Sequence, residues 1–443
     1  MFTQTKNIIR ELGDGLILRH GSPEDADALC AFNARIHGDD EEDGRRVAAW
    51  TRDLISRPHP TLKPEDFTIV QEAATGRIVS SLNLIPQTWT YEGIEFGVGR
   101  PELVATDSNY RGKGLVRIQF DEIHRWCEER GLMVQGITGI PYFYRQFGYE
   151  FALDLGGRRF GFDAPKLKDD EAEKFQFRPA EERDIPFLLE TYRHGRRRSM
   201  VSSQWTVELC RYQLFIRDRN SVQRAEYRVI EHIGSGERVG YLAHAPWLGM
   251  TGVNMYEYEL TPGVSWLEVT PAVARYLWEA GQEYAKAENR PCTSYGFNLG
   301  ARHPSYEVMD SKLPQVIAPY AWYLRVPDQV GFLNHIKPAL EKRLAESVVC
   351  GHSGEFLIGM YPTGFKLTLE RGRIAGIEAW KPDHADQGNA AFPALTFLQV
   401  LFGYRSFDEL RHAFPDCWCD NDGTRAVIQA LFPKKHSGPL GVA

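Results

Sequence analysis

The chain has 443 residues, of which 43% are apolar, 25% charged and 12% aromatic. This is the composition of an ordinary globular protein, and the length suffices for about two to four domains. The formal charge of −7, from 52 basic and 59 acidic residues, argues against a general nucleic-acid binder, because such proteins usually carry an excess of Lys and Arg. We therefore expect no nucleic-acid partner.

Cysteine usage and hydropathy favour a cytoplasmic protein. No apolar run approaches the roughly 20 residues of a membrane-spanning helix, and the first residues lack the apolar segment of a secretory signal. The seven cysteines are dispersed, which fits reduced thiols better than a disulfide framework. Cys417 and Cys419 are the only close pair, and two thiolates do not complete a zinc site. We expect no metal and no membrane contact.

An internal repeat is the first organising feature along the chain. Three residues recur with a shift of 159 positions: Arg19, Asp25 and Leu29 correspond to Arg178, Asp184 and Leu188. Each copy predicts a short strand, an acidic helix start and an apolar-striped helix. Residues 74–79 and 234–239 each predict a hairpin turn that enters a strand. The matching order favours a duplication over chance similarity of two α/β stretches.

The repeat and the changes in composition predict three domains in a mixed α+β chain. The charged, apolar-poor segment 166–174 predicts a linker, and the second unit ends near residue 326. The following sequence predicts a compact α+β unit. Its expected helices are 330–344, 396–402, 407–412 and 426–431, and its expected strands are 356–358, 365–369 and 374–380. The predicted domains are 1–165, 166–326 and 327–443.

A glycine-bearing loop in the first unit predicts an anion site. Residues 103–106 predict the end of a strand, and the sequence Arg-Gly-Lys-Gly-Leu-Val follows at 111–116. Apolar residues at 116, 120, 123 and 127 then predict a helix. Free N–H groups at the start of a helix favour an anion such as phosphate. The loop matches neither a P-loop nor a dinucleotide-binding fingerprint.

A second motif follows about 30 residues later, at 141–149, with the sequence Pro-Tyr-Phe-Tyr-Arg-Gln-Phe-Gly-Tyr. Together the two motifs resemble the GNAT acetyltransferase family, whose pyrophosphate loop carries R-x-x-G-x-G/A. Arg111 and Gly114 match that loop, although Val116 stands where a small residue is usual. Tyr144 and residues 147–149 match the family's Tyr followed by F/L-G-F/Y.

The whole chain resembles the Eis family of acetyltransferases. That family has an N-terminal GNAT domain with the active site, a second GNAT-like domain without the motif and a domain similar to sterol carrier proteins. Residues 401–406 and 430–433 resemble its last domain. In the second unit, 266–269 predicts the equivalent strand and 274–285 the helix. Residues 270–273 between them contain neither Gly nor Arg, so we expect no cofactor there. The resemblance also implies a homo-hexamer.

The resemblance implies direct transfer of an acetyl group from acetyl-CoA to a primary amine. The strand expected to face the pantetheine is Leu103, Val104, Ala105 and Thr106. The loop expected to hold the pyrophosphate is Arg111, Gly112, Lys113, Gly114, Leu115, Val116 and Arg117. Gly139 and Ile140 match positions near the acetyl group. Lys113 is either simply exposed or reaches a phosphate of CoA.

The same resemblance assigns two catalytic groups. Tyr144 matches the general acid that protonates the leaving thiolate; the alternative is a core tyrosine with a satisfied hydroxyl. The family's base is the C-terminal α-carboxylate, which here belongs to Ala443. The tail ends in small residues without the usual terminal aromatic, so either Ala443 reaches the site, or water relays the proton, or this chain end differs.

Two charged segments have open interpretations. Residues 37–43, His-Gly-Asp-Asp-Glu-Glu-Asp, lie where the family's first helical region borders the acceptor, or form a solvated acidic loop. Residues 193–198, Arg-His-Gly-Arg-Arg-Arg, favour a solvated face or a subunit contact, with a nucleic-acid or phosphate patch as the alternative.

The leading function is N-acetylation of a small amine, such as an aminoglycoside-like molecule or a polyamine. The alternatives are a lipid or sterol carrier with the GNAT units as scaffold, and acetylation of protein lysines.

Overall fold

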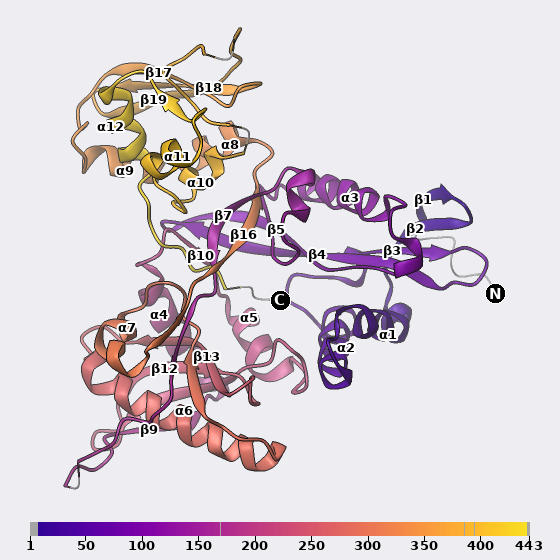
Figure 1. Cartoon of the computed structure of the whole chain (residues 1–443), viewed down its shortest axis with the longest axis vertical. Helices are drawn as coiled ribbons and strands as arrows, with labels where there is room; N and C mark the ends of the chain where they lie inside the picture. The colour runs from indigo at the N-terminus through magenta and orange to yellow at the C-terminus, as the bar shows by residue number, and fades with distance from the viewer. Residues whose placement is uncertain (1–7, 169, 385, 394, 441–443) are drawn as a thin grey trace.

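The computed structural model describes residues 8–168, 170–384, 386–393 and 395–440. This part of the chain is a mixed α+β molecule built on three sheets, as the sequence predicts (Figure 1). The predicted division into 1–165, 166–326 and 327–443 remains a prediction, because the strands of the first two sheets cross the first boundary in both directions.

The first sheet has the strand order β1-β2-β3-β4-β5-β6-β16-β7, with β10 paired to β4. Its strands are β1 Ile8–Gly13, β2 Leu16–His20, β3 Phe67–Glu72, β4 Ile78–Tyr91, β5 Ile94–Thr106, β6 Val134–Ile137, β7 Glu150–Leu155, β10 Val201–Ser203 and β16 Tyr320–Arg325. Helices α1 (Ala26–His37) and α2 (Glu41–Ser56) cover one face, and α3 (Leu115–Glu129) covers the other (Figure 1). The helix predicted after the glycine loop is α3, and its residues Phe120, Ile123 and Cys127 are buried.

The second sheet has the order β15-β8-β14-β13-β12-β11-β9. Its strands are β8 Arg158–Gly161, β9 Phe175–Pro179, β11 Glu226–His232, β12 Arg238–His244, β13 Gly252–Leu260, β14 Ser294–Phe297 and β15 Gln315–Ile317. Its helices are α4 Ile185–Arg196, α5 Val207–Arg211, α6 Trp266–Glu288 and α7 Pro304–Met309.

The third sheet has the order β19-β18-β17-β20-β21. Its strands are β17 Gly354–Gly359, β18 Gly364–Glu370, β19 Arg373–Trp380, β20 Ala390–Ala391 and β21 Trp418–Cys419. Its helices are α8 Gln329–His335, α9 Lys337–Ala345, α10 Phe397–Leu401, α11 Phe407–Ala413 and α12 Asp422–Leu431. These elements match the predicted ones closely, although the helix expected over 330–344 is divided at Ile336.

The first two sheets repeat the same local hydrogen bonds, here with a shift of 160 residues, one more than that of the first repeated segment. In the β3–β4 turn the amide of Glu72 donates to the carbonyl of Arg77, and in the β11–β12 turn the amide of His232 donates to that of Glu237. The equivalent strand of the second unit is β13, which pairs with β12 as β5 pairs with β4.

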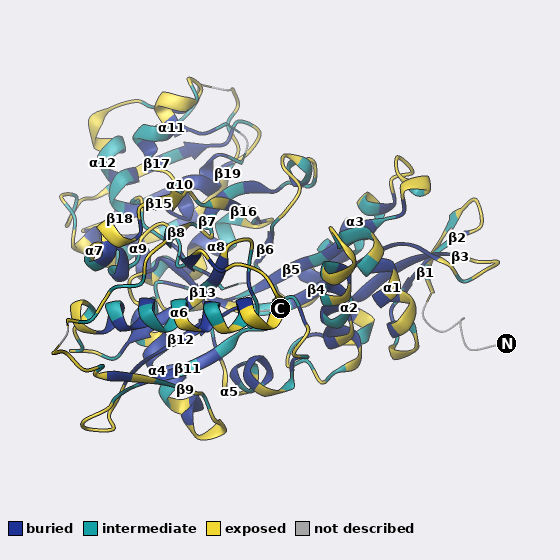
Figure 2. Ribbon diagram, turned by 60° about the horizontal axis from the view of Figure 1, so that its bottom comes forward, coloured by how far each residue is buried: buried dark blue, intermediate teal, exposed yellow. Residues whose placement is uncertain are grey.

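The prediction of a strand at 266–269 is wrong, because these residues form the first turn of α6. Trp266, Val269, Val273 and Leu277 recur at steps of three and four, which is the helical period. Val269, Val273 and Leu277 are buried while Leu267 is 70% exposed. Figure 2 shows this alternation along α6. A four-residue apolar run cannot by itself distinguish a strand from a buried helical turn.

Two strands are exchanged between the first two sheets. β8 follows β7 in the chain but lies between β14 and β15 of the second sheet. Conversely, β16 follows the second unit but lies between β6 and β7 of the first sheet (Figure 1). Each sheet is therefore completed by a segment from the other half of the repeat.

The first and third sheets share one continuous apolar core. The ring of Tyr91, at the end of β4, contacts Phe332 of α8 and lies 6.3 Å from Phe402, and its hydroxyl donates to the carbonyl of Leu401 at 2.7 Å. Since buried apolar area is the main source of stability, this contact helps to hold the third sheet against the first.

Candidate active site

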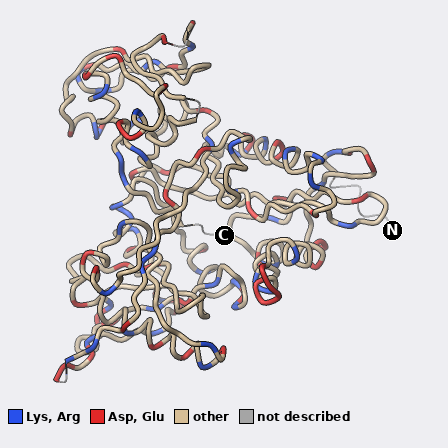
Figure 3. Tube along the Cα trace, viewed as in Figure 1, with Lys and Arg blue, Asp and Glu red and all other residues tan. Residues whose placement is uncertain are grey.

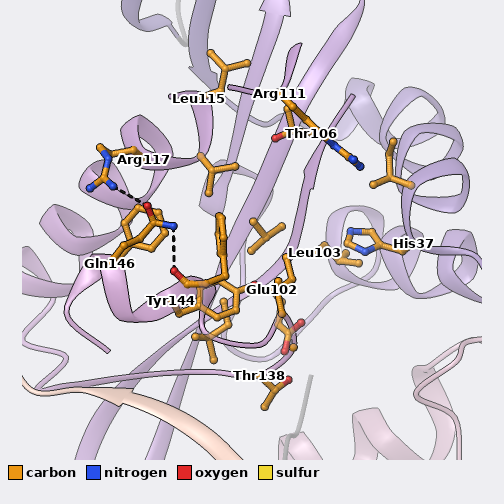
Figure 4. Close-up of a pocket in the computed structure, with 18 of the residues that line it drawn as sticks. His37, Glu102, Leu103, Thr106, Arg111, Leu115, Arg117, Thr138, Tyr144 and Gln146 are labelled. Atoms are coloured by element: carbon orange, nitrogen blue, oxygen red, sulfur yellow. Dashed lines mark hydrogen bonds between the residues drawn. The ribbon is translucent and has the colours of Figure 1, made fainter. Parts of the chain in front are cut away.

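A cavity of about 950 Å³ lies beyond the point where β5 and β6 separate. The parallel pairing of these strands joins Val98 to Val134 and Gly99 to Gln135. Beyond it, the cavity is lined by β5, the loop before α3, the segment after β6 and the C-terminal end of α1 (Figure 4). These segments are far apart in the sequence, and the fold brings them to one place.

A β-bulge in β5 shapes the floor of the cavity. Ser81 pairs with Ala105 and Asn83 with Glu102, so that Leu103 and Val104 together oppose Leu82 alone. Leu103 has φ +51°, a left-handed conformation that costs a non-glycine residue about 1 kcal/mol or more. Such bulges interrupt the regular ladder and are found beside functional sites. The bulge turns this part of β5 toward the cavity.

The structure brings together most residues of the predicted cofactor strand. Leu103, Val104 and Thr106 line the cavity. Ala105 does not; it is 2% exposed and packs in the core beneath α1 and α2. Alternation would direct two of the four side chains away from the cavity, but the bulge at Leu103 and Val104 interrupts it, so that only Ala105 is absent from the lining.

The glycine-bearing loop ends at the start of α3, as the sequence predicts. Gly112 and Gly114 have φ values of +78° and +74°, where a side chain would be strained. Gly114 is the N-cap of α3, and its carbonyl accepts the first helical hydrogen bond, from Ile118. The first N–H groups of a helix have no intrahelical partner. The loop therefore presents an N-terminal helix dipole and free N–H groups to an anion.

Six residues of this loop line the cavity: Arg111, Gly112, Gly114, Leu115, Val116 and Arg117. The guanidinium of Arg117 donates to Gln146 at 2.8 Å and lies over the ring of Phe147 (Figure 4). Arg111 is exposed and has no ion pair among the described residues. Lys113 does not line the cavity and lies 3.8 Å from the carboxylate of Asp14.

Tyr144 lies on the opposite side of the cavity, in a short 3-10 helix at Phe143–Phe147. Its ring is 3% exposed and packs against the rings of Phe120, Phe143 and Tyr323. Its hydroxyl makes no hydrogen bond with another described residue and lies close to Gly139. Burial, followed by the charge of Glu102, raises the pKa of Tyr144, so that the phenol stays protonated.

The neighbouring tyrosines lack this combination of features. Tyr142 is 71% exposed, and the hydroxyl of Tyr149 lies 3.1 Å from Nε2 of His124. Of the three tyrosines in the second motif, Tyr144 is thus the one whose free hydroxyl faces the cavity.

Gly139 and Ile140 line the cavity beside Tyr144. The exchanged strand β16 holds them from behind. Tyr320 donates to the carbonyl of Gly139 at 3.3 Å, and Tyr323 donates to that of Ile140 at 3.3 Å. A residue predicted to lie near the reacting group is therefore positioned by the other half of the chain.

Sequence reasoning missed Glu102 and His37 as individual site residues. Both line the cavity, with His37 across from Tyr144 (Figure 4). Arg100 donates to the carboxylate of Glu102. Burial lowers the pKa of His37, and the charge of Glu102 opposes this effect; Nε2 of His37 has no partner in the described part of the chain. The available signal for Glu102 was an acidic residue directly before the cofactor strand.

The acidic segment after His37 caps α2 and does not line the cavity. Asp40 accepts from the amide of Asp43 at 2.8 Å, and Glu41 and Glu42 pair with arginines one turn later. Figure 3 shows this acidic start of α2 exposed beside the first sheet.

The C-terminal tail runs along β10. The amide of Gly438 donates to the carbonyl of Val201 at 3.0 Å, and Ser203 donates to the carbonyl of Leu440 at 2.7 Å. Ala443 lies outside the described residues.

No three His, Cys, Asp or Glu side chains in the described ranges gather as metal ligands. None of the described helices combines the length and apolarity needed to cross a membrane.

Comparisons with known proteins agree with this geometry. A search of curated proteins finds no significant match. The chain resembles a GCN5-related N-acetyltransferase from Anabaena variabilis (TM-score 0.62, 13% identity, 96% of this chain and 98% of that chain). It also resembles one from Kribbella flavida (0.60, 16%, 96% and 97%) and Eis1 from Mycobacterium abscessus (0.57, 12%, 97% and 99%). At such identities these similarities show a shared fold. The family model for the acetyltransferase (GNAT) domain matches residues 18–152. The chain therefore carries a GNAT N-acetyltransferase domain at residues 18–152, which contains the cavity-lining loop and Tyr144.

Proposed function

We propose that this enzyme transfers an acetyl group from acetyl-CoA directly to a primary amine of a small molecule, aminoglycoside-like or a polyamine. The observation that carries the proposal is the single cavity that gathers the helix-start loop, the bulged strand and the free hydroxyl of Tyr144. Acetyl-CoA supplies an activated thioester, and the chain has to bind it, position the amine and manage two protons.

The residues present fit acetyl-CoA. Diphosphate oxygens match the N–H groups at the start of α3, with Arg111 and Arg117 beside them. The left-handed glycines keep side chains away from this approach. Val104 and Thr106, beyond the bulge at Leu103 and on the side that β6 leaves free, offer backbone groups to the pantetheine amides, in the manner of an added strand.

Tyr144 is the proposed proton donor to the departing sulfur. Because burial raises its pKa, the phenol is protonated across the neutral range. A thiolate released into a dry site is a strong acceptor for that proton. The hydroxyl is free to donate since it has no partner among the described residues.

Glu102 is the proposed acceptor of the proton from the incoming ammonium. Its carboxylate lies in the cavity, 15% exposed, and attracts a cation electrostatically. The neutral imidazole of His37, whose pKa burial lowers, offers a second polar contact to the amine. The α-carboxylate of Ala443 remains the alternative base implied by the sequence resemblance.

An amine panel assayed with acetyl-CoA tests the function. It contains a polyamine, an aminoglycoside and a lysine-containing peptide, so that it also tests the protein-lysine alternative. Acetyl-CoA is expected to raise the melting temperature, and thiol release is expected with a small amine. No thermal shift would reject the proposal. Turnover of the peptide alone would change the substrate class.

The remaining expectations are part of the proposal. The third sheet with its helices is the proposed sterol-carrier-like domain, acting as scaffold. Its core is filled by aromatic rings that pack edge-on or tilted against one another, such as Phe365, Phe392 and Phe397, which supports a structural role over a lipid carrier. The seven free cysteines support a reducing, cytoplasmic location. The hexamer implied by the sequence resemblance is tested by light scattering, and lipid carriage by binding of a fatty acid to delipidated protein.

A further inference from the structure

A second cavity, of about 790 Å³, lies where all three sheets meet. Its walls are the β4–β5 hairpin, the C-terminal half of α4, the segment around β10, and α9. It shares no lining residue with the first cavity. The proposed acetyl transfer gives this space no role.

The lining of the second cavity is strongly cationic. Six basic residues and three glutamates line it: Arg193, Arg196, Arg197, Lys342, Arg343, Lys435, and Glu92, Glu95, Glu346. Of the glutamates, Glu92 is already engaged, by Arg343 at 3.1 Å and by Lys435 at 2.6 Å. Figure 3 shows Lys and Arg gathered where the part of the chain built on the third sheet meets the part built on the second. The excess positive charge is therefore available to a ligand.

Three of these basic residues have no ion pair in the part of the chain that the structure describes. Arg193 lies on α4, Arg197 directly follows α4, and Lys342 lies on α9; all three are exposed at the cavity. Like charges gathered on low-dielectric walls raise the local concentration of anions.

Buried donors without partners point to the same conclusion. Nε1 of Trp205 and Nη2 of Arg343 make no hydrogen bond with any described residue, and their residues are 4% and 9% exposed. Nε of Arg196 is also a buried donor that makes no hydrogen bond with any described residue. An unsatisfied buried donor costs about 1–3 kcal/mol. All three orphaned groups are N–H donors, so the missing partner is an acceptor.

The surrounding side chains add a rigid aromatic wall. Tyr192 and Trp205 stack with ring centroids 5.1 Å apart, and the guanidinium of Arg196 lies 4.8 Å from the centroid of Tyr192. Ser202 lies 2.9 Å from the hydroxyl of Thr90. These contacts fix the donors in place, so that little ordering is needed when a ligand binds.

We propose that this cleft binds a small anion bearing phosphate or carboxylate oxygens. The oxygens pair with the exposed cations of Arg193, Arg197 and Lys342, while Trp205 and Arg343 lie in the wall of the cleft. Since these cations lie at the end of α4 and on α9, occupancy joins α4 to α9. The proposal does not depend on acetyl transfer.

Calorimetry and thermal shift with inorganic phosphate and with citrate test the site and separate the two ligand sources. Constant ionic strength removes general salt effects. The protein is the full chain carrying Arg111→Ala, which weakens anion binding at the first cavity. The test variant adds Arg193→Gln and Arg197→Gln, which are exposed and leave the core intact. The control adds Arg219→Gln and Lys312→Gln, an equal change of charge elsewhere on the surface.

One of the two anions is expected to raise the melting temperature of the control, and the test variant is expected to lose at least about tenfold in affinity. Quenching of Trp205, absent in Trp205→Phe, locates the ligand. Equal binding by the test and control variants would overturn the proposal, as would the absence of any shift at about 10 mM of either anion. A chain that carries Arg193→Gln and Arg197→Gln but keeps Arg111 is expected to acetylate amines at an unchanged rate, which distinguishes failure of this site from failure of the first.

Discussion

Arg178 holds Asp184 in a bidentate ion pair, with hydrogen bonds of 2.6 and 2.9 Å. Arg19 holds Asp25 in the same way in the first unit, at 2.7 and 2.6 Å. In both copies the aspartate also accepts from the amide three residues earlier, which fixes the start of the helix. Both copies of the repeat therefore keep this ion pair at the start of a helix, although the second copy has no counterpart of the loop at 111–117.

Breaking the ion pair between Arg178 and Asp184 is expected to destabilise the second unit. Although burial opposes the effect, hydrogen bonds from Arg178 lower the pKa of Asp184 to about 2. The stability that this ion pair contributes is present above pH 3.8, the ordinary pKa of an aspartate, and is lost as the pH falls from there toward 2. Asp184→Asn is expected to cost about 3 kcal/mol at neutral pH, measured by urea unfolding.

The comparison across pH is the control for Asp184→Asn. From about pH 5 to about pH 2.5, the free energy of unfolding of the variant is expected to fall less than that of the unaltered chain. Parallel losses would show that Asp184 does not carry the pH dependence.

Replacing Tyr144 by Phe is expected to lower turnover about 100-fold, because the proton donor to the leaving sulfur is lost. Affinity for CoA is expected to change little, since the hydroxyl has no described partner. Steady-state kinetics and calorimetry measure the two quantities. Tyr142→Phe is the matched control and is expected to retain activity. Equal loss of turnover and CoA affinity would make Tyr144 a structural residue.

Glu102→Gln is expected to lower kcat/KM for a cationic amine about 100-fold at neutral pH. The amide keeps an acceptor for Arg100, so folding is expected to be preserved, as checked by the melting temperature. With the base removed, the rate is expected to rise with pH as the free amine becomes more abundant. A pH profile unchanged from that of the unaltered enzyme would reject Glu102 as the proton acceptor.

Deleting residues 441–443 tests the alternative base. The contacts of Gly438 and Leu440 with β10 remain in this variant, so the tail stays attached. If Glu102 accepts the proton, turnover is expected to stay within about twofold. A loss of tenfold or more, with the melting temperature preserved, would instead assign the role to the α-carboxylate of Ala443.

The sequence predicted the parts of the site that depend on local backbone chemistry. The loop at 111–117 could be predicted because glycines before an apolar-striped helix have few other uses, and Tyr144 because of its place in a motif. The GNAT resemblance supplied roles that periodicity alone does not contain.

The sequence did not predict features that arise from long-range packing. Nothing near Glu102 or His37 indicates that α1 ends beside the bulge of β5. The wrong prediction of a strand at 266–269 has the same origin, since one short apolar run fits either a strand or a helical turn until its neighbours are known. The partnership of Tyr323 with Ile140 joins residues 183 positions apart.

The exchange of β8 and β16 means that the sheets of the two units depend on each other for their strands. A gene fragment that encodes residues 1–165 would leave the sheet open between β6 and β7, and would carry unpaired β8 residues made for another sheet. It would also lack Tyr320 and Tyr323, which hold Gly139 and Ile140 in the wall of the first cavity. The half of the chain that lacks a counterpart of the loop at 111–117 thus supplies a strand to the sheet beside that loop, and neither half can complete its sheet without the other.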